Sequence, residues 1–205
     1  MAVTRLFLIR HAEVEARYQN VFGGRIDMDL SPRGHQQACA LAAYLDRLPL
    51  ESVYASPMRR VQQTLAPWQR NGAPSQVALD DLREVDFGDW TGLAWEDLAD
   101  RFGQDAWQWL SYLEAGQVPN GETGTAFRAR IESCLARIAR DQSGRHVAVV
   151  CHGGVIRMIL SILLAIPLPQ MVTFAVDYAS VTRVALTRPR PQLELLNFTP
   201  WRRLP

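Results

Sequence analysis

The stretch Leu6-Phe7-Leu8-Ile9-Arg10-His11-Ala12-Glu13 decides how this chain folds. Its four apolar residues predict a strand that is buried on both faces of a sheet. Open α/β sheets place their ligand sites at the carboxyl ends of such strands. Arg10 and His11 stand at that end. Arg10 is a permanent cation whose fork of N–H groups fits phosphate or carboxylate. The imidazole of His11 can act as a nucleophile or transfer a proton near neutral pH. The stretch therefore predicts a buried strand that carries reactive groups to one edge of a sheet.

A second strand, expected over residues 52–55, is followed by a helix start that also carries cations. Ser56-Pro57 is typical of an N-cap with proline in the first turn, and the helix should continue to about Trp68. Arg59 and Arg60 stand at its beginning, and helix N-termini with neighbouring arginines bind anions. Adjacent helical residues point about 100° apart, so only one of the two is expected to face a site.

A third apolar run, residues 147–151, is the most strand-like of the chain and ends in His152-Gly153-Gly154. An apolar helix over residues 156–164 follows it. A strand, a polar residue, paired glycines and a helix form a layout that brings phosphate close to backbone N–H groups. With the three strand ends at one edge of the sheet, two histidines and two arginines can bind a dianionic phosphoryl group there.

Local patterns predict the remaining elements. Residues 15–29 have no clean period and indicate a long functional loop. Helices are expected from Ser31-Pro32 to about Leu48, within residues 95–116 and around Phe127 to Ile138, and strands over residues 77–79, 171–176, 180–187 and 192–197, the last two as a hairpin.

The composition limits what the chain can be. Its 205 residues, 48% of them apolar, fit one domain with a sizeable core. A formal net charge of +1 gives no electrostatic reason to expect nucleic acid or an anionic membrane as a partner. No apolar run reaches the length of about 18 residues that a membrane span needs, and the N-terminal residues lack the pattern of a secretory signal. We therefore expect a cytoplasmic protein.

Two residue types exclude particular chemistries. All 22 basic residues are arginine, which excludes Schiff-base chemistry on lysine and the G-x-x-x-x-G-K-[ST] phosphate loop. The three cysteines, at irregular spacing, predict neither a disulfide framework nor a zinc site. Cys39 and Cys134 lie in helical patterns and are expected in the core.

Five ordered blocks, spread over residues 9–154, resemble motifs of the histidine phosphatase superfamily, whose members have the phosphoglycerate mutase-like fold. The blocks are Ile9–Glu13 (R-H-G in the family), Ser56–Thr64 (S-x-L-x-R-A-x-x-T), Leu82–Trp90 (the segment of the general acid), Pro119–Thr123 (P-x-G-E-[ST]) and Val149–Gly154 (V-[ST]-H-G-G). The resemblance implies an α/β three-layer sandwich with a mostly parallel mixed sheet. It implies a single domain over residues 1–205, with a cap-like helical insertion over the active site at about 85–122.

The resemblance also implies a role for each residue of a phosphate site. His11 would be the nucleophile, and Glu84 would protonate the leaving alkoxide and then act as base for water. His152 would also take part in catalysis. The phosphate ligands would be Arg10, Arg60, His152 and Gly153, and no metal and no cofactor is implied. Further substrate contacts are expected at Arg17, Asn20, Gly23, Glu122 and Thr123.

Three positions depart from the family pattern. Ala12 replaces the glycine that follows the nucleophile, which a backbone φ below zero allows. Arg17 stands where many members have an asparagine that touches the phosphate, and Gly23 where a hydroxyl or an amide is common. These departures concern the outer pocket and leave the predicted chemistry unchanged.

The expected function is metal-independent hydrolysis of a small-molecule phosphomonoester through a phosphohistidine. The chain is most similar to α-ribazole phosphatases and broad-specificity small-molecule phosphatases, so α-ribazole 5'-phosphate is a candidate substrate. A cofactor-dependent phosphoglycerate mutase is the alternative within the family. Mutases of the family are longer and have a C-terminal lid, whereas here only Thr199–Pro205 follow the last strand. Hydrolysis is therefore favoured.

Two other classes of function compete with this interpretation. Cys151 and Arg157 match C-x5-R, the pattern of cysteine-dependent phosphatases, but such enzymes need an activated thiolate, and the pattern leaves Arg10, His11 and Glu84 without a role. A non-catalytic phospho-ligand sensor would be indicated by loss of His11 or Glu84, and both are present.

Overall fold

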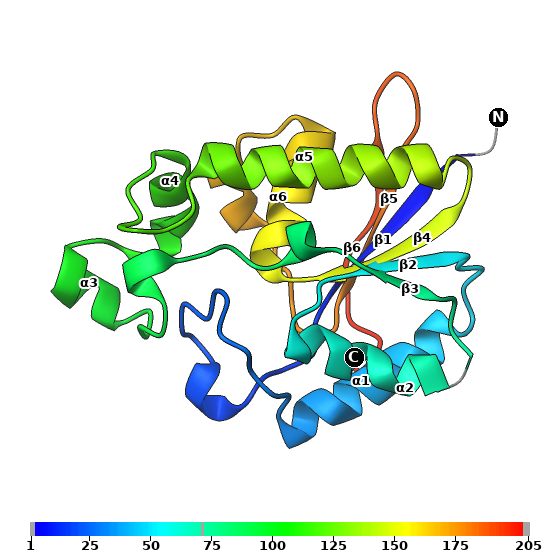
Figure 1. Ribbon diagram of the computed structural model, residues 1–205, viewed down its shortest axis with the longest axis horizontal. Coiled ribbons are helices and arrows are strands. Elements are labelled where there is room, and N and C mark those ends of the chain that lie inside the picture. The colour runs from blue at the N-terminus through cyan, green and yellow to red at the C-terminus, as the bar shows by residue number, and fades with distance from the viewer. Residues whose placement is uncertain (1–2, 71, 203–205) are drawn as a thin grey trace.

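Six strands form one mixed sheet in the order β3-β2-β4-β1-β5-β6 (Figure 1). The computed structural model describes residues 3–70 and 72–202, so the end of the predicted tail, residues 203–205, lies outside the described residues. The strands are β1 (Arg5–Arg10), β2 (Ser52–Ala55), β3 (Gln76–Ala78), β4 (His146–Cys151), β5 (Val181–Ala185) and β6 (Gln192–Phe198). The first four in chain order are parallel, and β5 and β6 are antiparallel. The predicted α/β class, the mostly parallel mixed sheet and the C-terminal hairpin are thus confirmed.

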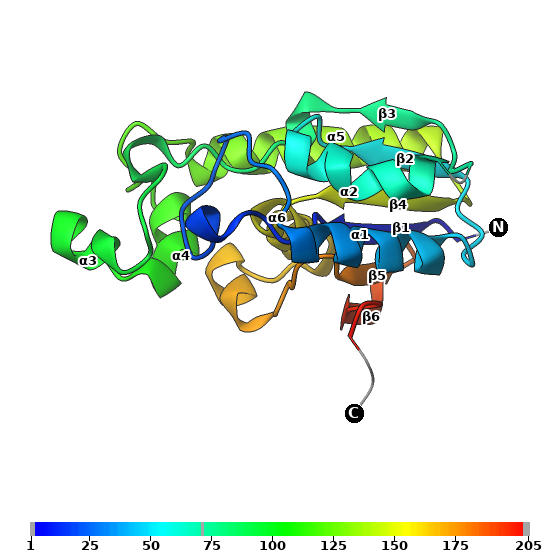
Figure 2. The ribbon, with the colours of Figure 1, turned by 90° about the horizontal axis from the view of Figure 1, so that it is seen from below.

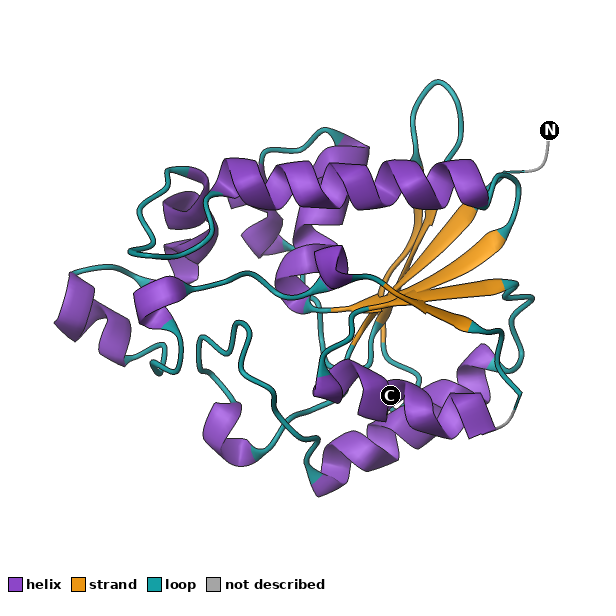
Figure 3. Ribbon diagram, viewed as in Figure 1, coloured by secondary structure: helices purple, strands orange, loops and turns teal. Residues whose placement is uncertain are grey.

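Helices cover both faces of the sheet, as the purple and orange ribbons of Figure 3 show. One face carries α1 (Pro32–Leu45) and α2 (Arg59–Arg70), and the other carries α5 (Gly124–Asp141) and α6 (Gly153–Leu164) (Figures 1 and 2). Two shorter helices, α3 (Asp97–Phe102) and α4 (Trp109–Glu114), lie beyond the end of the sheet. Within the described ranges, no helix is long and apolar enough to cross a membrane.

Strand β1 lies between β4 and β5, and its side chains alternate between the two cores. Leu6 and Leu8 are buried among residues of α5 and α6, whereas Phe7 and Ile9 are buried among residues of α1 and α2. This burial on both faces explains why the sequence of β1 is continuously apolar.

The parallel register aligns the strand ends that carry the predicted site residues. Arg10 pairs with Cys151, and Ala55 of β2 pairs with Val150 of β4. The residues that follow the three strands therefore leave the sheet at the same edge, which is the carboxyl edge.

Three local predictions are wrong, each for an identifiable reason. The strand expected over residues 171–176 is a 3-10 helix over Leu168–Thr173, because prolines open this segment and Leu168 and Met171 are buried one 3-10 turn apart. Helix α2 begins at Arg59 and not next to Ser56, because its first helical hydrogen bond is accepted by Met58 O, from Gln62 N–H at 3.1 Å. Cys39 is exposed because it lies on the outer face of α1, whereas Cys134 is buried as expected.

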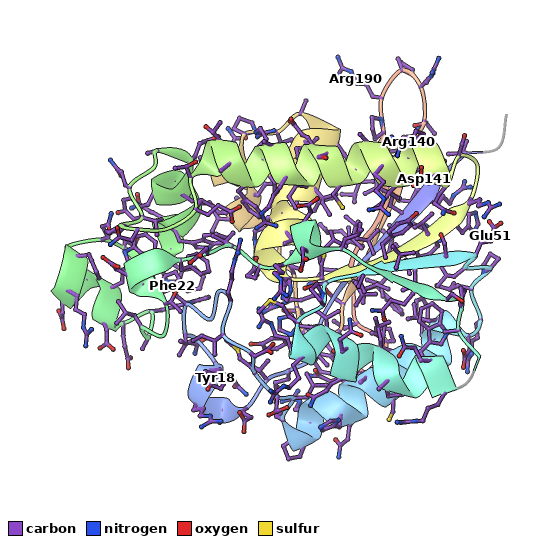
Figure 4. All side chains as sticks on the ribbon, viewed as in Figure 1. Tyr18, Phe22, Glu51, Arg140, Asp141 and Arg190 are labelled. Carbon is purple, nitrogen blue, oxygen red and sulfur yellow. The ribbon has the colours of Figure 1, made fainter. Side chains whose placement is uncertain are left out.

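Residues 85–122, called the cap segment below, extend past the carboxyl edge of the sheet (Figure 1). They include α3, α4 and the 3-10 turns Gly88–Trp90 and Ala106–Gln108. The segment is joined to the loop after β1, because Phe22 N–H donates to Leu93 O at 2.9 Å and Trp95 N–H donates to Asn20 O at 2.8 Å. Figure 4 labels Tyr18 and Phe22 on that loop, on the side of the molecule where α3 and α4 lie.

Candidate active site

His11 lies directly after β1, with only 5% of its surface exposed. Its Nδ1 lies 2.8 Å from the carbonyl oxygen of Ala12, and Nε2 accepts a hydrogen bond from Arg60 Nε at 3.2 Å. These contacts assign the tautomer with the proton on Nδ1, which leaves a lone pair on Nε2. Ala12 is absent from the residues with positive φ, as its side chain requires. Its N–H donates to the hydroxyl of Thr64 at 2.9 Å, so the nucleophile candidate is held on both sides.

Arg60 joins the two histidines of the site. Its Nε lies 3.2 Å from His11 Nε2 and 3.1 Å from His152 Nδ1. Its terminal nitrogens donate to the carbonyl oxygens of Ile26 and Gly24, at 2.8 and 2.9 Å. Since a guanidinium carries five N–H donors, these contacts hold the group in place and leave one N–H on each terminal nitrogen for another acceptor.

His152 is fully buried and has both ring nitrogens engaged. Its Nδ1 accepts from Arg60, so Nε2 carries the proton and donates to the hydroxyl of Ser56 at 2.8 Å. The His11 and His152 rings lie with their centroids 5.2 Å apart. The ends of β1, β2 and β4 thus meet in one hydrogen-bonded group.

Burial keeps both histidines neutral. It lowers the pKa of His11 well below 6.5, and the neighbouring charges of Arg60 and Arg10 lower it further. The pKa of His152 is also lowered, first by burial and then by Arg60. A neutral imidazole, whose Nε2 is unprotonated, is the nucleophilic form, and the lowered pKa keeps His11 in this form below pH 6.5.

Arg10 and Arg157 add two more cations. Arg10 donates to Val176 O at 2.6 Å, and its guanidinium carbon lies 4.0 Å from the centroid of the Tyr178 ring. The Nε atoms of Arg10 and Arg157 are buried and have no hydrogen-bond partner among the described residues. Burial lowers the pKa of Arg157, and that of Arg60, to about 10, so both remain charged at neutral pH. The three arginines form an anion site with unused donors.

Glu84 lies at the N-terminus of α6. One carboxylate oxygen accepts from Gly154 N–H at 3.1 Å, and the other accepts from Val85 N–H at 3.1 Å. A Cβ at position 154 would lie 2.5 Å from this carboxylate, so a side chain there would displace the carboxyl group of Glu84. Glu84 is the only carboxylate among the residues that line the pocket described next.

These groups form the floor of a pocket of about 180 Å³ with aromatic walls, which is named the catalytic pocket after the predicted role of its residues. The walls include Phe22 and Tyr178 together with aromatic residues of the cap segment, which are Phe87, Trp95, Trp107 and Trp109. The pocket therefore combines a cationic floor, which suits a phosphoryl group, with walls that suit an apolar or flat substituent.

The predicted site residues divide into two groups. His11, Arg10, Arg60, Glu84, Gly153 and Gly23 line the pocket, and His152 lies beneath Arg60. The other predicted substrate contacts, Arg17, Asn20, Glu122 and Thr123, do not line it. Arg17 is exposed and pairs with Glu15, and Glu122 forms a half-buried ion pair with Arg130. Thr123 is the N-cap of α5.

Several pocket residues were not predicted from the sequence. Arg157 is one turn of α6 after Gly153, so helical spacing alone could have placed it near the phosphate. Tyr178, Trp107 and Trp109 reach the pocket only through tertiary packing, and no local pattern signals this.

Cys151 is fully buried on β4, and burial raises the pKa of its thiol well above the usual value. It does not line the pocket. Both observations disfavour a thiolate nucleophile. Among the described residues, no group of three or more histidine, cysteine or carboxylate side chains could hold a metal ion.

The two buried histidines should make stability depend on pH. In the unfolded chain, His11 and His152 bind protons below about pH 6.5, whereas in the folded chain they stay neutral. The free energy of unfolding should therefore decrease as the pH is lowered below 6.5, by up to about 1.4 kcal/mol per histidine for each pH unit. Above pH 6.5 this loss is absent. Urea unfolding at pH 7.5 and 5.5 measures the difference. The fall should be smaller in His11→Asn and unchanged in His35→Asn, because His35 is exposed on α1; an equal fall in all three proteins contradicts the assignment.

Comparison with known proteins gives a consistent result. The family model described as histidine phosphatase superfamily (branch 1) matches residues 6–199. An adenosylcobalamin/α-ribazole phosphatase of Escherichia coli (strain K12) is 30% identical over 94% of this chain and 95% of its own length. Phosphoserine phosphatase 1 of Hydrogenobacter thermophilus is 28% identical over 96% of this chain and 93% of its own. The crystal structure of the α-ribazole phosphatase from Shigella flexneri has a TM-score of 0.82 at 28% identity, covering 94% of this chain and 96% of that one.

Proposed function

Because this chain belongs to the histidine phosphatase superfamily, we propose that it hydrolyses small phosphomonoesters through a phosphohistidine on His11, with Glu84 as acid and base. The family and its phosphatase relatives make the chain a phosphoric monoester hydrolase. The observation that carries the proposed mechanism is the position of Arg60 Nε, at 3.2 and 3.1 Å from the two histidines. It places a cation against the unprotonated Nε2 of His11.

In the first step, His11 Nε2 attacks phosphorus, the N–P bond forms and the bond to the leaving oxygen breaks. Glu84 gives its proton to that oxygen, which departs as an alcohol. The charges of Arg10, Arg60 and Arg157 stabilise the phosphoryl oxygens during the transfer. These side chains supply three positive charges around the dianion, so the mechanism needs no metal ion.

In the second step, water attacks phosphorus and the N–P bond breaks. The carboxylate of Glu84 takes the proton of the water, which restores its acid form and leaves inorganic phosphate. Its two backbone hydrogen bonds, from Gly154 and Val85, hold the carboxyl group at the pocket in both steps. In this proposal the cap segment covers the site and selects the leaving alcohol.

The relatives differ in the substrates that their names give, which are α-ribazole phosphate and phosphoserine. We take α-ribazole 5'-phosphate as the first candidate for this chain. Its leaving alcohol carries an aromatic ring system, and the side chains that border the phosphate site on the cap side, such as Phe87 and Trp109, are aromatic. The cytoplasmic location predicted from the sequence belongs to the same proposal.

The proposal is tested by phosphate release from a panel of small phosphomonoesters with EDTA present. We expect wild-type activity to persist under these conditions, because the charges on the phosphoryl group are offset by arginine. Glu84→Gln should reduce hydrolysis of alkyl phosphates far more than that of p-nitrophenyl phosphate, since p-nitrophenolate leaves without a proton.

Three results contradict the proposal. The first is that chelation abolishes the activity and a divalent ion restores it. The second is that Glu84→Gln loses activity equally on both types of substrate. The third is that the enzyme isomerises phosphoglycerate faster than it releases phosphate. Asp89→Asn serves as a matched control, because Asp89 is an exposed carboxylate of the cap segment outside the pocket.

A further inference from the structure

A second, larger cavity lies beside the catalytic pocket. The two share Trp95, Ala106 and Trp107 in their walls. The outer cavity has a volume of about 860 Å³, whereas the catalytic pocket has about 180 Å³. Pockets for drug-sized ligands have volumes of roughly 300–1,000 Å³. The catalytic pocket therefore suits a phosphoryl group with a small substituent, and any larger leaving alcohol must extend beyond it.

Trp107 stands at the boundary of the two cavities and is 66% exposed. Its ring packs edge-on against Trp95, with the centroids 5.3 Å apart. The backbone N–H of Trp107 donates a hydrogen bond to the Asp105 side chain at 2.9 Å, which fixes the start of the 3-10 turn that carries the indole. An indole fixed in this way and left exposed is a stacking surface for a flat ring.

The charges of the two cavities have opposite signs. The outer cavity is lined by two carboxylates, Glu96 and Asp105, and by no cationic residue, whereas three arginines line the catalytic pocket. Glu96 is exposed, and its side chain makes no hydrogen bond or ion pair with another described residue. The side-chain amides of Asn20 and Gln104 add neutral donors and acceptors to these walls. This set favours hydroxyl groups or a positive charge and disfavours an anion.

We infer that the outer cavity binds the far part of the leaving alcohol, and that it selects a flat ring with hydroxyl groups and without negative charge. This inference rests on the proposed function, and it adds a second binding site for the same substrate. The catalytic pocket takes the phosphate, Trp107 stacks on the ring and Glu96 repels anionic substituents. Nucleoside-like phosphomonoesters fit this description.

Three probe substrates separate these contributions. Glycerol 3-phosphate is too short to reach the outer cavity, uridine 5'-monophosphate carries an uncharged ring, and orotidine 5'-monophosphate adds a carboxylate to the same ring. Wild type should have its highest kcat/KM on uridine 5'-monophosphate. Trp107→Ala should reduce that value about tenfold, which is the size of a typical stacking contribution, and should reduce the value for glycerol 3-phosphate much less.

Glu96→Arg should shift the preference between the two nucleotides toward orotidine 5'-monophosphate by about tenfold. Glu114→Arg is the matched control, because Glu114 is exposed on α4 and lines neither cavity; its ratio should equal that of wild type. Equal losses on all substrates in Trp107→Ala, or an unchanged nucleotide ratio in Glu96→Arg, overturn the inference while phosphatase activity stands. Absence of phosphate release from every phosphomonoester overturns the proposed function, and the inference with it.

Discussion

Arg60→Ala should lower kcat/KM for phosphate release by about 100-fold to 1,000-fold, the range that follows loss of one preorganised charge-stabilising donor. The variant removes the cation that contacts both histidines and leaves the lone pairs of His11 Nε2 and His152 Nδ1 without a donor. The adjacent Arg59→Ala should keep nearly full activity. The Arg59 side chain is half exposed and pairs with Asp29 at 3.1 Å, at the surface.

Because Arg60 is buried, its loss must be separated from simple unfolding. Arg60→Lys keeps the charge but lacks the planar fork that donates to Ile26 O and Gly24 O, so it should recover only part of the activity. Urea unfolding of each variant shows whether the folded state persists at assay temperature. If both variants are folded and Arg59→Ala loses as much activity as Arg60→Ala, the proposal that the phosphate binds at Arg60 is wrong.

His11→Ala should lower the turnover rate by more than about 10³-fold, and the covalent intermediate should be absent from this variant. The chain offers two side chains that could carry a phosphoryl group, His11 and Cys151, and the two intermediates differ in stability. A phosphoramidate on imidazole is labile in acid and stable in alkali, whereas a thiophosphate ester survives acid better. The lone pair of His11 faces the arginine cluster, while Cys151 is fully buried away from the pocket with a raised pKa.

Enzyme mixed with a ³²P-labelled substrate is quenched in an alkaline denaturant, and the labelled protein is then treated with acid or with alkali to test this choice. The label should be lost in acid and retained in alkali, and it should be absent from His11→Ala. Cys151→Ser should keep most of the activity, since the thiol lies in the apolar core and its hydrogen bond is to the backbone carbonyl oxygen of His152, at 4.0 Å. An acid-stable phosphoenzyme that disappears in Cys151→Ser identifies a cysteine mechanism and contradicts the proposed one.

The sequence predicted the elements whose patterns are local. β1 is apolar on both faces, α1 begins at Ser31-Pro32 as predicted, and the hairpin of β5 and β6 flanks a proline-containing turn. The grouping of the site residues could also be predicted, because parallel strands end at a common edge. The resemblance selected Arg60 over Arg59, and the structure places the Arg60 side chain in the pocket.

Features that depend on long-range packing could not be predicted in this way. Residues 171–176 are apolar enough for a strand, but the prolines favour a 3-10 helix, and burial of Leu168 and Met171 stabilises it. The C-x5-R pattern paired Arg157 with Cys151, although in the fold Arg157 lies near Arg10 in the pocket. The outer cavity arises where the cap segment meets the loop after β1, so no single stretch of sequence encodes it.

Because the site residues follow aligned strand ends, we expect the carboxyl edge of the sheet to tolerate inserted residues less well than the opposite edge. One residue added to the end of β4 would displace His152 by about 3.3 Å relative to β1, which is enough to break its contact with Arg60. The loop between β5 and β6 lies at the opposite edge, where Figure 4 labels Arg190 at its tip. An affinity tag or a fluorescent reporter inserted at residues 188–191 would therefore leave the register of the catalytic edge intact, which makes this loop the place to label the enzyme.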